Sequence, residues 1–113
     1  MTPENTAWLN NIIELDRNGQ DKICTRRIIS KFLDLVVQKD YTTISDMFSE
    51  FNKHKLSIFV SLCLLTITRC NISNIPSVKE FFVAFEKRVI EERGADEAKK
   101  LMTVLYESLG GDN

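Results

Sequence analysis

The sequence of 113 residues predicts an all-α fold, a compact bundle of about five or six helices. Apolar residues recur at the i, i+3, i+4, i+7 spacing of a helix in several segments. Only 4 glycines and 2 prolines are present, too few for the many tight turns of an all-β fold. The run from Leu56 to Ile67 carries no charged residue and must therefore be covered on nearly every side. We expect antiparallel hairpins packed around a central buried helix over residues 56–68, in one domain over residues 1–113.

The first two helices are predicted from their ends and their apolar spacing. Residues 2–4 (Thr-Pro-Glu) supply a hydroxyl cap, a proline at the first helical position and an early carboxylate, and Asn18 and Gly19 end the helix. The second helix is expected to begin near residue 20 or 21 and to reach about Lys39. Its apolar residues cover more than half of its circumference, so we expect it to pack on two neighbours. These residues are Ile23, Cys24, Ile28, Ile29, Phe32, Leu33, Leu35, Val36 and Val37.

The remaining helices follow from capping patterns and breakers. Thr43 resembles the first residue of a capping box on a third helix that ends near residue 53. In the central helix we expect Leu62, Cys63 and Leu65 to be fully buried. Residues 71–76 are expected to form the longest loop, and Ser77 with Glu80 stands at capping-box spacing for a fifth helix that Gly94 closes. A last helix begins at residue 95 or 96, and residues 110–113 are expected to be a disordered tail.

Composition excludes several classes of function. The chain has 15 basic and 16 acidic residues, which lacks the basic excess of a general nucleic-acid binder. The uncharged run is about twelve residues long, whereas a bilayer span needs about twenty, so we expect no membrane span. Three cysteines without a Cys-x-x-Cys pair suggest small buried residues in a reducing compartment. We expect a cytoplasmic protein.

The chemistry-bearing residues form no catalytic or metal-binding pattern. The single histidine, His54, stands between two lysines at an expected helix end, where no nucleophile or carboxylate partner can be placed. Cys63 and Cys70 are too far apart, and Cys24 too remote, for a zinc site. Phosphate-loop, hydrolase, metalloprotease and calcium-loop motifs are all missing. We therefore expect no enzymatic activity and no cofactor.

The candidate binding residues lie mainly on the second helix. Arg26, Arg27 and Lys31 form a narrow basic strip, which is either a simple solvated face or a contact for an acidic partner. Tyr41 and Trp8 are candidate aromatic anchors, although an aromatic residue on an apolar stripe such as that of Trp8 more often belongs to the core.

The chain also resembles a loose pattern in small bacterial helical-hairpin proteins of uncharacterised activity. The segments that carry the resemblance are residues 29–35 (ISKFLDL), residues 64–68 (LLTIT) and residues 75–77 (IPS), followed by Phe81 or Phe82, Val89 and Arg93-Gly94. The second helix is usually acidic in that pattern and is basic here, and residues 102–105 (MTVL) replace a leucine-glycine element. The resemblance implies a helical fold and implies no substrate or site.

A helical scaffold without a catalytic set favours a protein–protein interaction module. We expect an adaptor, or a small inhibitor of the kind that phages and other mobile elements encode, that binds a protein partner through an exposed helical face. One alternative is a nucleic-acid-associated regulator that uses the basic strip, although the expected third helix carries no basic residue to read a DNA groove before Lys53. The other alternative is a homodimer that buries an apolar face of the fifth or sixth helix.

Overall fold

The computed structural model describes the backbone of residues 1–72 and 74–108, and the side chains of residues 1–67 and 74–105. Across this part of the chain every regular element is an α-helix, which confirms the predicted fold class. The predicted tail at residues 110–113 lies outside the described residues. The helices are α1 (Pro3–Arg17), α2 (Asp21–Val37), α3 (Tyr41–Phe51), α4 (Ile58–Ile72), α5 (Pro76–Arg93) and α6 (Ala95–Ser108).

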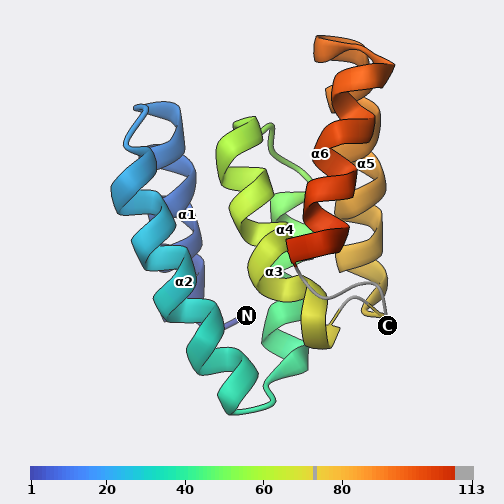
Figure 1. The fold of residues 1–113 in the computed structure, drawn as a ribbon. Helices are drawn as coiled ribbons and strands as arrows, with labels where there is room; N and C mark the ends of the chain where they lie inside the picture. Colours follow the sequence, from blue (N-terminus) through green and yellow to red (C-terminus); the bar gives the residue numbers. More distant parts are fainter. Residues whose placement is uncertain (73, 109–113) are drawn as a thin grey trace.

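The six helices form three antiparallel hairpins that stand side by side in two layers (Figure 1). The helices α1, α3 and α5 make the rear layer in this view, and α2, α4 and α6 make the front layer. The front layer has α4 in its centre, where α4 packs closely against α2 and only at a few places against α6. This arrangement leaves the front of α4 between two flanking helices.

Local signals explain most of the helix ends. The Thr2 side chain accepts a hydrogen bond from the Asn5 amide at 3.1 Å, as the sequence predicts for the start of α1. Gly19 adopts a left-handed φ of 73° after α1, and Gly94 a φ of 91° after α5. Both positive angles favour glycine because it has no Cβ to clash with the neighbouring carbonyl.

Both predicted capping boxes are wrong. Asp40, and not Thr43, caps α3: its carboxylate accepts from the Thr43 amide at 3.2 Å and from the Thr43 hydroxyl at 2.7 Å. Ser77 is buried inside the first turn of α5, where its hydroxyl donates to the Ser45 carbonyl at 2.9 Å. A buried hydroxyl needs a hydrogen-bond partner, and Ser77 finds it in a carbonyl of the neighbouring helix α3 instead of capping its own helix.

The central helix is longer and less enclosed than predicted. It extends to Ile72, so the loop before α5 is shorter than the expected residues 71–76. Val60, Leu64 and Leu65 are buried, whereas Leu62 and Cys63 are only half-buried, which corrects the expectation that both are fully buried. An uncharged helix has no polar face to indicate which side remains open, and the open side of α4 is the front layer's outer surface.

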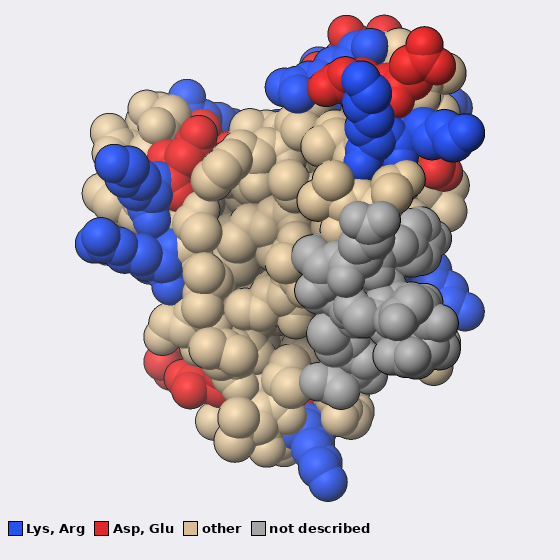
Figure 2. Space-filling view, viewed as in Figure 1, with Lys and Arg blue, Asp and Glu red and all other residues tan. Residues whose placement is uncertain are grey.

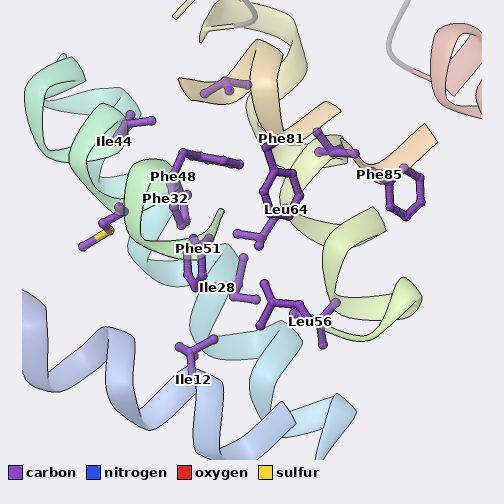
Figure 3. Close-up of a cluster of buried hydrophobic side chains, with 14 of the residues drawn as sticks. Ile12, Ile28, Phe32, Ile44, Phe48, Phe51, Leu56, Leu64, Phe81 and Phe85 are labelled. Atoms are coloured by element: carbon purple, nitrogen blue, oxygen red, sulfur yellow. The ribbon is translucent and has the colours of Figure 1, made fainter. Parts of the chain in front are cut away.

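The core joins the three hairpins through aromatic rings. Phe48 on α3 makes edge-to-face contacts with Phe32 on α2 at 5.8 Å and with Phe81 on α5 at 5.2 Å between ring centroids. Figure 3 shows these rings together with aliphatic side chains that include Ile12 from α1, Ile28 from α2 and Leu64 from α4. Trp8 on α1 adds a further edge contact to Phe32 at 6.2 Å. No helix in the described part of the chain is long and apolar enough to cross a membrane.

Candidate functional site

Helix α2 carries more apolar side chains than the bundle buries. Cys24, Ile28, Phe32 and Leu35 face the core. As predicted, α2 packs on two neighbours, α1 and α4, and it also contacts α3. Four of its large apolar side chains nevertheless remain exposed. They are Ile23, Ile29, Leu33 and Val37.

A groove of about 360 Å³ lies between α2 and α4 on the front layer. Phe59 forms one end of its α4 wall and is 54% exposed, an unusual state for a phenylalanine in a helix otherwise rich in buried residues. The α4 residues lie at successive i, i+3 and i+4 positions, so they form one stripe along the helix. The lining residues are Ile29 from α2, and Phe59, Leu62, Cys63, Thr66 and Ile67 from α4.

Among the described residues, charge is absent from the floor of the groove and present at its rim. None of the six lining residues is charged. Lys22 and Arg26 are exposed on α2, and Lys22 lies about two turns before Ile29 on the same row of the helix. Figure 2 shows an uncharged surface down the middle of the front layer, with lysine and arginine side chains at its left margin and at upper right.

Among the described residues, the Cys63 thiol is the one thiol that lines the groove. Burial raises the pKa of this thiol. Cys24 lies deeper, where burial raises the pKa of its thiol to about 12, and its Sγ donates to the Ile12 carbonyl at 3.7 Å. A raised pKa keeps both thiols protonated near neutral pH, so neither is an activated nucleophile.

The structure divides the predicted basic strip between two sides of α2. Arg27 donates from Nη1 to Oδ1 of Asn11 on α1, and the Lys31 ammonium lies 5.8 Å from the centre of the Trp8 ring. Arg26 is exposed about 100° around the helix from Arg27, toward the groove. Three of the predicted site residues therefore meet at the α1–α2 contact, and Arg26 stands apart from them.

The two aromatic candidates occupy different environments. Trp8 is half-buried and packs against the core, as expected for an aromatic residue on the apolar stripe of α1. Tyr41 is 41% exposed and is the first residue of α3, at the α2–α3 turn. Tyr41 does not line the groove between α2 and α4.

A second hollow of about 240 Å³ lies beside the link from α3 to α4 and is lined in part by Lys53, His54, Lys55 and Arg88. Its positive charge is partly neutralised. Lys53 lies 3.1 Å from Glu50, and Arg88 lies 2.8 Å from Glu92 and also donates to the Leu56 carbonyl. The arginine lowers the pKa of the Glu92 carboxyl, mainly through their hydrogen bond. The paired arginine therefore holds the link against α5.

The described residues contain no group of three or more histidine, cysteine or acidic side chains that could hold a metal ion. No protein-family model, curated protein or solved structure matches this chain. The groove between α2 and α4 is thus defined by its own geometry alone. Sequence reasoning did not find it, although the surplus of apolar residues on α2 and the uncharged length of α4 were its two signals.

Proposed function

We propose that the chain is a protein–protein interaction module that binds an amphipathic helix of a partner protein in the groove between α2 and α4. The observation that carries this proposal is the exposure of Phe59, at 54%, beside the 41% exposed Ile29. Their exposure costs free energy in the isolated chain, because each apolar Å² left in water forgoes about 25 cal/mol. A docked apolar side chain recovers that free energy.

The shape of the groove supports a helix as the occupant. The α4 wall from Phe59 to Ile67 is about 12 Å long at 1.5 Å per residue, which matches about two turns of a docked helix. A helix of that length presents apolar residues at i, i+3 or i+4, and i+7, and these fit between two parallel helical walls. An extended peptide would leave its backbone amides against apolar side chains without partners.

The charges around the groove support an acidic partner. Lys22 and Arg26 on α2 stand beside an uncharged floor, so carboxylates on the polar face of the docked helix can reach them while its apolar face is buried. Such contacts at the rim speed association and depend on ionic strength more than they raise affinity.

A nucleic acid is less compatible with this surface. Phosphate binding needs several cations that point outward together, whereas Lys31 lies over the Trp8 ring and Arg26 is about 100° around α2 from Arg27. Base stacking needs exposed aromatic residues on the same face as the cations. A mobility-shift assay with duplex and single-stranded DNA at 50 and 200 mM salt should therefore show no specific complex.

The test is a comparison of three tagged proteins in pull-downs from the source organism: the wild type, Phe59→Glu and the matched control Val83→Glu. Val83 is an exposed apolar residue on α5, outside the groove, so both substitutions add one carboxylate at an exposed apolar position. We expect a partner that the wild type and Val83→Glu retain and that Phe59→Glu loses.

The same preparations give a second measurement at the groove itself. A synthetic peptide that covers the helix of the captured partner should slow alkylation of Cys63 at saturation, because that thiol lies in the groove lining. A partner retained equally by Phe59→Glu, or one that leaves the alkylation rate of Cys63 unchanged, would show that the groove is not the binding site.

A further inference from the structure

The outward face of α2 is distinct from its groove side. Arg27 and Lys31 contact α1, and Ile29 lines the groove toward α4. Between these two sides, α2 has a face that is exposed to solvent, and the small residue Ser30 lies at its centre. All the residues of this outward face are exposed: Ile23, Arg26, Ser30, Asp34 and Val37, with Val37 at 80%.

We propose that this face binds a second copy of the chain, with the two α2 helices antiparallel across a two-fold axis at Ser30. This interface is centred about 100° around α2 from Ile29 of the groove, with Arg26 between the two surfaces, and it goes beyond the proposed binding of a partner helix. Ile23 and Val37 lie about two turns on either side of Ser30, so the two-fold axis places Ile23 of one copy opposite Val37 of the other. The small serine at the axis lets the two helix backbones approach closely.

The charges on this face match under the same axis. Arg27 and Asp34 lie on the same flank of α2, on opposite sides of Ser30 and at nearly equal heights from it. Across the two-fold axis, Asp34 of one copy and Arg27 of the other differ in height along the helix axis by only about 1.5 Å. Equal charges stay apart, because the two copies of Arg27 differ by about 9 Å in height and the two copies of Asp34 by about 12 Å.

The other flank is compatible with the same contact. Arg26 of one copy lies level with Leu33 of the second, so its methylene stem can cover that exposed leucine while its guanidinium remains in water. Within the described part of the chain Asp34 has no salt bridge, so its carboxylate is available to the second copy.

The exposed face of α5 fails the same geometric test, although the sequence suggested that a homodimer would use the fifth or sixth helix. Val83 and Ile90 are both exposed, and a two-fold axis midway between them would pair their side chains. The axis would also place Glu86 against its own copy and Lys87 against its own copy. Like charges directly opposed disfavour association, so α2 is the self-complementary surface.

The expected dimer is weak. One helix from each copy makes the contact, so the interface lies at the small end of the range for specific complexes. We therefore expect a dissociation constant in the micromolar range, and self-association that becomes visible only when the protein concentration is varied.

The decisive experiment uses charge inversion and analytical ultracentrifugation from about 1 µM to 1 mM protein. Arg27→Asp makes this flank wholly acidic and Asp34→Arg makes it wholly basic, so each variant alone should self-associate at least about tenfold more weakly than the wild type. An equimolar mixture of the two variants restores both opposite-charge pairs and should dimerise as strongly as the wild type or better.

The mixture also guards against misfolding, because a variant that fails to fold cannot regain dimerisation when mixed. A wild type that stays monomeric throughout the concentration range would overturn the proposal. So would single variants that dimerise as the wild type does, or a mixture that remains monomeric although both variants give the circular dichroism spectrum of the wild type.

A covalent test reports the position of the axis. In a Cys63→Ser, Cys70→Ser background, Ser30→Cys should form an intermolecular disulfide under mild oxidation, because a residue on the axis meets its own copy. Ser49→Cys is the matched control, since Ser49 is exposed on α3 and away from this face. Equal crosslinking of both variants would indicate random collision and contradict the axis at Ser30.

Discussion

The carboxylate of Asp16 connects the first hairpin to the second and positions one wall of the groove. Asp16 is near the end of α1, and its Oδ2 accepts a hydrogen bond from the Ser57 amide at 3.0 Å. Ser57 in turn caps α4, since its hydroxyl accepts from the Val60 amide at 3.2 Å. The negative charge therefore stands at the positive end of the α4 dipole. Substitution of Asp16 by alanine should loosen α4 from α1 and α2.

The size of this effect follows from the contact. A hydrogen bond to a charged group contributes about 1.5–3 kcal/mol, and a charge at a helix N-terminus a further 0.3–1 kcal/mol at most. One term opposes these, because Oδ1 of Asp16 is buried without a hydrogen-bond partner and its desolvation is relieved by the substitution. We expect Asp16→Ala to lower the free energy of unfolding by about 1.5–3 kcal/mol, or the melting temperature by roughly 6–13 °C.

Urea denaturation followed by circular dichroism measures this change. Asp16→Asn keeps an acceptor for the Ser57 amide without the charge, so its loss should be smaller, about 1 kcal/mol. Asp46→Ala removes an exposed carboxylate from α3 and should change stability by less than about 0.5 kcal/mol. A loss for Asp16→Ala no larger than that for Asp46→Ala would refute the assigned role of the hydrogen bond.

Three further predictions concern the core, the thiols and a turn. Phe48→Ala should reduce the free energy of unfolding by about 3–5 kcal/mol, because Phe48 joins three helices through its ring contacts, and Phe48→Leu by clearly less; urea titration distinguishes them. In the folded protein at pH 8, mass spectrometry of alkylated peptides should find Cys24 unmodified and Cys63 modified more slowly than in urea, at a rate that rises with pH as the thiol ionises. Gly94→Ala should destabilise the chain by about 1–3 kcal/mol, measured by thermal unfolding, because its φ of 91° excludes a Cβ without strain.

The helical fold could be predicted because each helix carries its own local signals. The apolar stripe of α3, the proline at the start of α1 and the glycines after α1 and α5 act within a few residues, so sequence spacing is enough to find them. The capping of α3 and α5 could not be predicted in the same way. Asp40 competes with Thr43 for the same helix end, and Ser77 bonds to a carbonyl on α3 that is remote in sequence.

The groove could not be predicted because periodicity finds an apolar face only by contrast with a polar one. Helix α4 is apolar on nearly every side, so its sequence does not separate buried Leu64 from exposed Phe59. The basic residues of α2 were the predicted partner contacts, whereas the structure places Arg27 and Lys31 in contact with α1. The more informative signal was the number of apolar residues on α2. They cover more than half of its circumference, which is more than the neighbouring helices can bury.

The two proposed surfaces of α2 are separated by about 90° around the helix, so each can be disrupted without the other. Binding in the groove depends on Phe59 and Ile29, which line it. Self-association depends on Arg27 and Asp34, on the flank of α2 away from the groove. The Arg27→Asp and Asp34→Arg variants should therefore retain the partner captured by the wild type and the wild-type alkylation rate of Cys63. Phe59→Glu should lose the partner and keep the wild-type dimerisation constant. A single substitution that abolished both activities would mean that α2 presents one continuous interface, because two independent surfaces cannot be lost through one exposed side chain in a folded protein.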